Sequence, residues 1–324
     1  MATTNSTIEK IAPMFTELLV KKIECLKTDW QKPWIASLEQ GLPRNIRGTL
    51  YNGGNVLMLL FYTEFMKFTL PVFLTFNQAK EEDLSVCKGA RSFPVYYWFK
   101  FVVHKETKKT IKYEEYRKLS ATEQENYKVI PQMKYYNVFN IEQTNFAEKH
   151  PERYERMKKN EQPDNHSDGM MFDALDELVY TQNWYCPIKV KYSDSAFYVS
   201  SADYIVCPEK RQFPQGVEFY GTLLHEMAHS TGSPQRLNRT FGNFFGDALY
   251  AREELVAELT SALCGAFFGY AAAPQDNNAA YLKHWLTKLK EEPAFLVEIL
   301  GDVNKAAKMI AERVTEPINE PAAA

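Results

Sequence analysis

Two histidines and a glutamate lie close together in the segment GTLLHEMAHSTG, residues 221–232. In an α-helix, positions i and i+4 lie on one face, so His225 and His229 can point at the same metal ion. Glu226 lies about 100° further round the helix and can reach a water molecule bound to that ion. Two neutral imidazole ligands beside a general base form the HExxH pattern, so the spacing predicts a catalytic zinc site. The alternative is a chance match on an amphipathic core helix.

Two histidines alone make a poor zinc site, so a third ligand must come from elsewhere in the chain. The metzincin pattern HExxHxxGxxH is excluded, because Gly232 is present but position 235 is occupied by Gln235. A carboxylate from a following helix is the other solution. The segment YAREELVAELTSALCGAFF (250–268) is a predicted helix that supplies three glutamates.

We predict Glu254 as the third ligand, with Glu258 one turn further on as an outer partner that hydrogen-bonds a ligand histidine. An acidic pair in a helix of otherwise apolar and small residues calls for such an explanation. Glu253 and Glu258 remain alternatives for the ligand itself. The simpler interpretation is that the glutamates are solvated near a helix start and stabilised by its dipole, and it suits Glu253 best.

With three protein ligands, a fourth coordination position stays open for water, as in catalytic rather than structural zinc sites. Glu226 would take a proton from the bound water as it attacks an amide carbonyl, and would pass that proton to the leaving nitrogen. The oxyanion needs a donor besides the metal. Tyr220, Tyr250 and Arg236 are available, and the sequence does not choose among them.

The bulk composition is that of an ordinary globular protein, with 45% hydrophobic and 24% charged residues in a chain of 324. This length suits two domains. No apolar run is long enough to span a membrane, and the N-terminus lacks the basic and apolar parts of a secretory signal. The five cysteines are scattered and never form CxxC, which predicts free thiols in the cytoplasm and speaks against a cysteine-based zinc site.

Charge and pattern divide the chain into two parts. The first 150 residues carry a net positive charge and the remainder a net negative charge, which suggests that the first part meets an anionic partner. The polar, turn-rich stretch 148–168 predicts a linker between domains at 1–147 and 169–324. Strand-like segments followed by a run of helices in the second part indicate an α+β fold.

The pattern of apolar residues predicts the individual elements. Helices are expected at 7–27, 55–68, 169–183, 214–231, 248–270, 278–290 and 293–314, and strands at 92–105, 134–141 and within 187–208.

Four segments of the second part carry a resemblance: FYVSSADYIVCP (197–208), TLLHEMAHSTGSPQRLNR (222–239), FGDALYAREELVAEL (245–259) and AAYLKHWLTKLKEEP (279–293). They resemble the zincin-like metallopeptidase domain of the ArdC antirestriction family. The resemblance implies a gluzincin-type HExxH domain. A strand before the HExxH helix would form the edge of the cleft, where an extended peptide could add as a further strand.

The first part carries its own resemblance, in WQKPW (30–34), GLPRNIRGTLYNGGNVLML (41–59), FLTFNQAKEEDLSVCKGARSFPVYYW (73–98) and YYNVFNIEQTN (135–145). These segments resemble the ArdC N-terminal domain, which is also found in TraC-type primases. The resemblance implies a small α/β domain that binds single-stranded DNA, in a protein of mobile elements that protects incoming DNA from restriction. The chain departs from the family at KGARSFPV (88–95) and by an insertion-like stretch at 105–130.

Sequence-independent binding of a DNA strand requires cationic side chains and flat rings on which bases stack. The interleaved candidates in the first part are Lys32, Arg44, Arg47, Tyr51, Lys80, Lys88 and Arg91. Gly53 and Gly54 precede a predicted helix, where a phosphate could approach backbone N–H groups. Trp34, Phe76 and Trp98 are expected in the core, because large aromatic side chains are mostly buried.

Two functions follow from these patterns. The first is a zinc metallopeptidase of unknown protein substrate that is tethered to single-stranded DNA, with one Zn²⁺ per chain or another divalent metal in its place. The second is a non-proteolytic protein that protects DNA by covering single strands, with a structural or vestigial metal site. A complete metal site does not name a substrate, so the sequence leaves both open. Neither involves a membrane.

Overall fold

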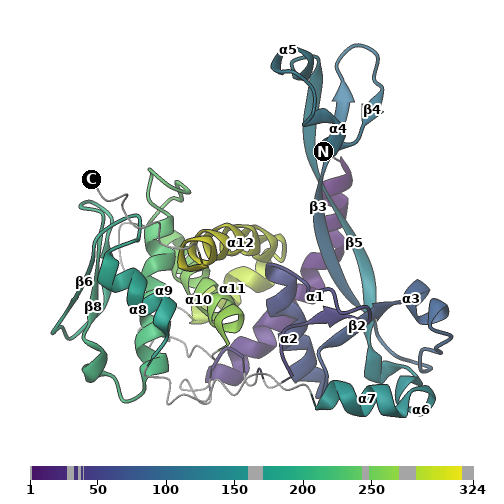
Figure 1. Ribbon diagram of the computed structural model, residues 1–324, viewed down its shortest axis with the longest axis horizontal. Coiled ribbons are helices and arrows are strands. Elements are labelled where there is room, and N and C mark those ends of the chain that lie inside the picture. Colours follow the sequence, from purple (N-terminus) through teal and green to yellow (C-terminus); the bar gives the residue numbers. More distant parts are fainter. Residues whose placement is uncertain are drawn as a thin grey trace, which may run out of the picture.

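A computed structural model describes residues 2–27, 33–35, 38, 40–159, 171–242, 248–269 and 282–315. The two-domain α+β architecture predicted from the sequence is confirmed: a mixed sheet with a long projecting ribbon lies in the N-terminal half, and a helical layer with a small sheet forms the C-terminal half (Figure 1). Within the described residues, no helix combines the length and apolar composition needed to cross a bilayer.

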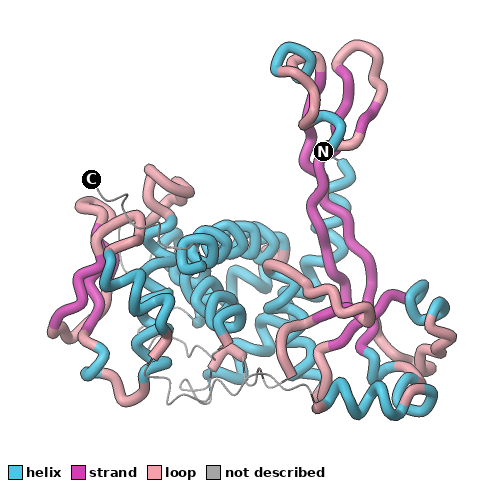
Figure 2. Tube along the Cα trace, in the orientation of Figure 1, coloured by secondary structure: helices cyan, strands magenta, loops and turns pink. Residues whose placement is uncertain are grey.

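The N-terminal sheet has five strands in the spatial order β1-β2-β5-β3-β4. Their bounds are β1 Arg44–Asn45, β2 Val72–Thr75, β3 Phe93–His104, β4 Thr110–Ile111 and β5 Tyr127–Asn140. β3 and β5 pair antiparallel along their whole length, from Phe93 opposite Val138 to His104 opposite Tyr127. This two-stranded ribbon projects far from the rest of the molecule (Figure 2). Its β-branched and aromatic residues favour the extended backbone.

The described residues of this half form seven helices: α1 Ala2–Lys27, α2 Gly54–Met66, α3 Phe76–Glu81, α4 Tyr113–Tyr116, α5 Ala121–Gln124, α6 Phe146–Lys149 and α7 Pro151–Lys158, with the 3₁₀ turn η1 at Ile141–Gln143. In α1, Ile11, Phe15, Leu19 and Ile23 recur every four residues, so they form one fully buried stripe. The start of α1 runs along the ribbon, where the Thr7 hydroxyl donates to Met133 O at 3.2 Å.

The C-terminal half consists of a three-stranded sheet and a helical layer. The strands β6 Ile188–Lys191, β7 Phe197–Val199 and β8 Tyr204–Pro208 lie in the order β6-β8-β7, so β7 is an edge strand. The helices are α8 Asp173–Thr181, α9 Gly216–Thr231, α10 Ala248–Phe268, α11 Leu282–Glu291 and α12 Ala294–Thr315, with the 3₁₀ turn η2 at Lys210–Gln212. These bounds confirm the helices and strands predicted from the apolar periodicity.

The two halves share one hydrophobic core, because α1 and α2 pack against the helices of the C-terminal half. The Thr16 hydroxyl of α1 donates to Pro293 O at 3.1 Å, just before α12. Gly53, at φ 56°, leaves no room for a side chain, since an added Cβ would come 2.5 Å from Asn304 Oδ1. The expectation that Gly53 and Gly54 leave room for a phosphate is therefore wrong. The absence of side chains at these two positions lets α12 pack closely against the backbone.

The described start of the predicted linker 148–168 is unexpectedly helical. It includes the end of α6 and all of α7, where Tyr154 and Met157 pack against a small core beside the sheet. Pro151 occupies the first turn of α7, where its missing N–H costs no helical hydrogen bond. Residues 160–168 lie outside the described part of the chain. The proposed boundaries at 147 and 169 stay predictions.

Candidate metal centre

α9 places the two histidines on one face and buries them. Leu223, Leu224 and Met227 are fully buried around them, so the helix is covered on most sides. The Nε2 atoms of His225 and His229 converge to 3.0 Å from each other. The predicted i, i+4 geometry is therefore present, with both imidazoles aimed at a common point.

Glu254 reaches the same point from α10, which packs on α9. Its carboxylate oxygens lie 3.4 Å from His225 Nε2 and 3.5 Å from His229 Nε2. The two helices are joined by the Ser261 hydroxyl, which donates to Gly221 O at 2.9 Å. Ligand atoms about 2.0–2.1 Å from a tetrahedral zinc ion lie about 3.3 Å apart, so this spacing fits such an ion. Among the described residues, this is the group whose donor atoms could hold a metal.

Glu253 stands behind His229, and the expectation that it is solvated is wrong. The side chain is only 3% exposed, and its Oε1 lies 3.3 Å from His229 Nδ1. Arg239 donates to both oxygens of Glu253, at 2.6 and 2.9 Å. Its other hydrogen bonds go to Ala228 O and Thr231 Oγ1, which fix the guanidinium against the end of α9. A charged group is buried here because a bidentate partner compensates it.

Glu258 lies on the Nδ1 side of His225, but the hydrogen bond predicted between the two side chains is not present. Its Oε1 lies 3.8 Å from His225 Nδ1, which is longer than a hydrogen bond. Its Oε2 accepts a hydrogen bond of 2.6 Å from the indole Nε1–H of Trp34. Trp34 is fully buried, which confirms its expected place in the core. No feature of the sequence pointed to a contact between Trp34 and α10.

Glu226 lies beside the histidines and is 7% exposed. Burial raises the pKa of its carboxyl, and the neighbouring imidazoles offset this only in part. The backbone N–H of Tyr198, on the edge strand β7, faces this carboxylate and also acts to lower its pKa. A carboxylate with a raised pKa accepts protons more readily, which suits a general base.

The charge balance of the centre favours a cation. Burial lowers the pKa of His225 and His229, but the Glu254 carboxylate and its neighbours raise both by more. Burial raises the pKa of Glu254, and the two imidazoles lower it by more. In the metal-free protein, the buried carboxylates thus favour positive charge on the imidazoles. A divalent ion between the same atoms would supply that positive charge instead, so the residues fit a metal.

Gly232 follows the last residue of α9, as predicted, but it does not adopt the left-handed backbone conformation of a typical glycine cap. Its φ is −77°, a value open to any residue. A Cβ at this position would come 2.7 Å from the Phe241 ring and 2.9 Å from Arg239 Nη2. Glycine is therefore needed so that Arg239 can approach α9 and hold Glu253.

The three candidate oxyanion donors have different surroundings. The Tyr220 hydroxyl accepts from the Phe172 N–H and from the Lys210 ammonium and donates to the Asp176 carboxylate, each at 2.7 Å. The guanidinium of Arg236 is bonded to Asp203, to the Tyr198 hydroxyl and to Ser230 O. Tyr250 is half-buried one helical turn before Glu254, on the same face of α10. This placement favours Tyr250.

The predicted DNA-binding residues that the structure describes differ in exposure and in partners. Lys32 lies outside the described residues. Arg44 is half-buried and donates to Gln40 O at 3.0 Å. Arg47 is exposed and paired with Glu81. Tyr51 packs edge-on against Phe73, and burial raises the pKa of its hydroxyl, so this ring belongs to the core rather than to a stacking surface.

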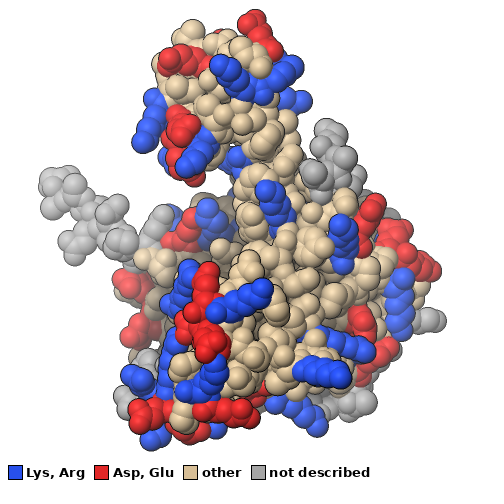
Figure 3. Space-filling model, turned by 90° about the vertical axis from the view of Figure 1, so that its right-hand side faces the viewer, with Lys and Arg blue, Asp and Glu red and all other residues tan. Residues whose placement is uncertain are grey.

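Lys80, Lys88 and Arg91 are exposed. The Lys80 ammonium lies 5.0 Å from the centre of the Phe76 ring, on α3. Phe76 and Trp98 are 52% and 51% exposed, so the expectation that both lie in the core is wrong. Seen from the side of the ribbon, Lys and Arg are interspersed with Asp and Glu around a large uncharged area (Figure 3).

The ribbon carries an aromatic face that the sequence reasoning missed. Tyr97, Phe99 and Phe101 alternate along β3, so they point to one side, and Tyr136 and Lys134 join them from β5. Tyr97, Phe101 and Tyr136 are 46%, 37% and 40% exposed. The Lys134 ammonium lies 4.7 Å from the centre of the Phe99 ring. The alternation of rings in YYWFKF was the available signal.

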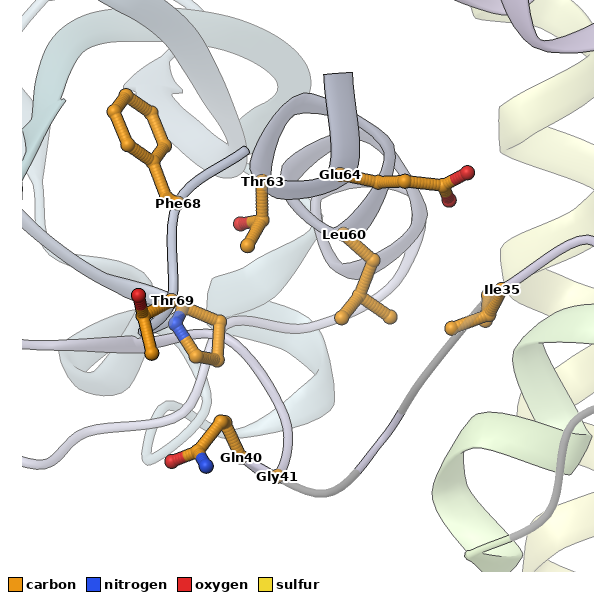
Figure 4. Close-up of a pocket in the computed structure, with 9 residues that line it drawn as sticks. Ile35, Gln40, Gly41, Leu60, Thr63, Glu64, Phe68 and Thr69 are labelled. Atoms are coloured by element: carbon orange, nitrogen blue, oxygen red, sulfur yellow. The ribbon is translucent and has the colours of Figure 1, made fainter. Parts of the chain in front are cut away.

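A small pocket of about 140 Å³ opens in the N-terminal half between α2 and the segment near Gln40 (Figure 4). Leu60, Ile35 and Thr63 contribute much of its wall. Its one carboxylate, Glu64, is paired with Lys22 at 2.8 Å. This lining offers no pair of groups for acid–base chemistry, so the pocket is separate from the metal centre in place and in character.

Two family models match the chain. One describes the N-terminal domain of the anti-restriction factor ArdC and matches residues 9–139; the other describes a zincin-like metallopeptidase and matches residues 173–299. Among curated sequences, the DNA primase TraC of Escherichia coli is 29% identical over 94% of this chain. The match covers 28% of that primase, so this chain spans little more than a quarter of its relative's length.

Two crystal structures of the antirestriction ArdC protein from the R388 plasmid are similar to this chain, both with a TM-score of 0.65. The metal-free structure is 26% identical, and the match covers 94% of this chain and 97% of that one. The Mn(II)-bound structure is 27% identical, with 94% and 98% covered.

Proposed function

We propose that this chain, which belongs to the ArdC antirestriction family, is an antirestriction protein with a metallopeptidase centre and a surface for single-stranded DNA. The observation that carries the enzymatic part is the convergence of His225, His229 and Glu254 beside the buried Glu226. The proposed metal is Zn²⁺, one per chain. The Mn(II)-bound relative makes another divalent ion the alternative.

The residues divide the chemistry as follows. A divalent ion bound by His225, His229 and Glu254 would polarise a peptide carbonyl and lower the pKa of a bound water. Glu226, whose own pKa is raised by burial, accepts the proton of the attacking water and delivers it to the leaving nitrogen. Tyr250 is the proposed donor to the oxygen that becomes negative.

Substrate binding is proposed at the edge strand β7, beside Glu226. The backbone N–H of Tyr198 on β7 faces the Glu226 carboxylate and acts to lower its pKa, so this strand lies close to the proposed catalytic residue. An extended peptide that adds to the edge of a sheet gains backbone hydrogen bonds whatever its sequence. This mode of binding leaves the identity of the substrate protein open.

Replacement of Glu226 by glutamine tests the enzymatic proposal. The variant keeps the shape of the side chain and removes its capacity to accept a proton. It should retain the metal, measured by elemental mass spectrometry, and lose hydrolysis of unfolded protein substrates. The His225→Ala variant is the control that should lose the metal as well. If Glu226→Gln hydrolyses at the wild-type rate, the proposed role of this residue is wrong.

A second candidate function is protection of DNA without proteolysis, and the aromatic face of the ribbon favours it. Exposed rings beside a cation form a platform on which bases stack without regard to sequence. The mixed charge of this side of the molecule makes stacking the more important contribution. If Glu226→Gln protects DNA from restriction as well as the wild type does, protection does not depend on peptide hydrolysis.

The cytoplasm is the proposed location. None of the five cysteines forms a disulfide, and Cys186, Cys207 and Cys264 are buried, which suits a reducing compartment.

A further inference from the structure

We propose that Trp34, from the N-terminal half, is a positioning residue for the metal centre of the C-terminal half and acts through Glu258. This inference rests on the metal binding proposed above. The indole Nε1–H of Trp34 donates to Glu258 Oε2 at 2.6 Å, and both side chains are at most 1% exposed. The other oxygen of Glu258 faces His225 Nδ1 at 3.8 Å. One carboxylate thus connects the N-terminal half to a metal ligand.

His225 needs a partner at Nδ1 when Nε2 binds a metal. An imidazole that coordinates through Nε2 carries its proton on Nδ1, and that N–H commonly donates to a carboxylate. In the structure, His225 Nδ1 is buried and makes no hydrogen bond to any described residue. A shift of about 0.6 Å brings Glu258 Oε1 within the usual N–H···O distance. Glu258 is therefore placed to orient His225.

The two ligand histidines are supported in parallel ways. Behind His229 stands Glu253, which is held by Arg239 from the same half. Behind His225 stands Glu258, which is held by Trp34 from the other half. Each imidazole has a carboxylate behind it, and each carboxylate has a buried donor. Of these two donors, Trp34 alone comes from the other half, so its hydrogen bond to Glu258 depends on how the two halves pack.

The N-terminal half determines where Trp34 lies. Its ring packs near Phe61 of α2, with ring centres 6.3 Å apart, and α2 contacts α10, which carries Glu258. A change that moves this part of the N-terminal half removes the hydrogen bond to Glu258 and weakens metal binding. By linkage, a bound metal stabilises the docking of the two halves to the same degree.

The full-length Trp34→Phe variant removes the indole N–H and keeps an aromatic ring. Trp285→Phe is the matched control, because Trp285 is equally buried and donates its Nε1–H to α10 at Ala251 O, 2.6 Å away. Zn²⁺ affinity is measured by competition with a chelator. Trp34→Phe should bind Zn²⁺ about 10-fold more weakly, as is typical for loss of an outer partner, and Trp285→Phe should match the wild type. Equal affinity of both variants would overturn the inference.

Glu258→Gln keeps an acceptor for Trp34 and places an amide opposite His225. It should lower Zn²⁺ affinity, and adding Trp34→Phe should cause little further loss, because both changes act through one carboxylate. Additive losses would overturn the path through Glu258. The visible spectrum of bound Co²⁺ gives a second readout, which should change in Trp34→Phe and not in Trp285→Phe. A wild type that binds no metal would instead refute the proposed function itself.

Discussion

Replacement of Arg239 by methionine tests whether its buried ion pair with Glu253, behind His229, stabilises the fold. The guanidinium donates two hydrogen bonds to Glu253 and one each to Ala228 O and Thr231 Oγ1, between 2.6 and 2.9 Å. Both side chains of the pair are 4% exposed. Methionine retains the apolar stem and leaves the Glu253 carboxylate buried without its cation.

The expected loss follows from this burial. Removing one partner of a buried ion pair costs about 3–5 kcal/mol, because the remaining charge is uncompensated. The exposed pair between Arg47 and Glu81, whose side chains are 62% and 58% exposed, provides the matched control. For such a pair the loss is about 0–1 kcal/mol, since water already solvates both groups.

The measurement is urea unfolding of the metal-free proteins near neutral pH. Arg239→Met should lower the free energy of unfolding by several times as much as Arg47→Met. The double variant Glu253→Gln with Arg239→Met should recover part of the loss, because a neutral amide is cheaper to bury than a carboxylate. If Arg239→Met loses less than about 1 kcal/mol, like the exposed control, the buried pair does not stabilise the fold as argued.

Metal-free protein should lose stability as the pH rises, because the pKa values of His225 and His229 are raised in the fold. This stabilisation is complete below the pKa of about 6.5 that histidine has in the unfolded chain, and it disappears as the pH passes through the raised pKa values. Zn²⁺ affinity should rise over the same pH interval, so the melting temperatures with and without Zn²⁺ should diverge, and parallel curves would contradict this. Tyr97→Ala should weaken binding of a poly-dT strand by about 10-fold, measured by fluorescence anisotropy, since a stacked base contributes about 1–3 kcal/mol. Tyr180→Ala, which removes an 89% exposed ring from α8, should leave that affinity unchanged, and an equal loss in both would refute binding on the ribbon. Tyr250→Phe should lower kcat for peptide hydrolysis about 100-fold or more with metal content intact, and an unchanged kcat would exclude it as the oxyanion donor.

The sequence predicted the local parts of this protein well. The i, i+4 spacing of the histidines, the helix that carries them and the glutamate-bearing helix after it are all short-range patterns, which the backbone geometry of a helix translates directly into a shared face. The strands of the ribbon were visible in part, as β-branched and aromatic runs at 92–105 and 134–141. The first half of β5 and its pairing with β3 were not predicted. Glu254 was chosen over its neighbours for the apolar setting of its helix face, and the structure places it beside both imidazoles.

The tertiary structure decided which charges are buried and what compensates them. From the sequence, Glu253 is typical of a solvated residue at a helix start, but in the structure Arg239, 14 residues earlier in the chain, binds its carboxylate. The sequence around Gly53 is typical of a phosphate-binding turn, but in the structure α12 packs against this glycine.

Trp34 and Glu258 are separated by 224 positions, and no periodicity or spacing relates residues so far apart. Hydrophobic patterning identifies the face that each helix buries, but it does not specify which other element packs against that face. The sequence therefore narrowed the ligands of the proposed metal centre to two histidines and one of three glutamates. Only the tertiary packing determined which glutamate lies beside both imidazoles and which side chains stand behind them.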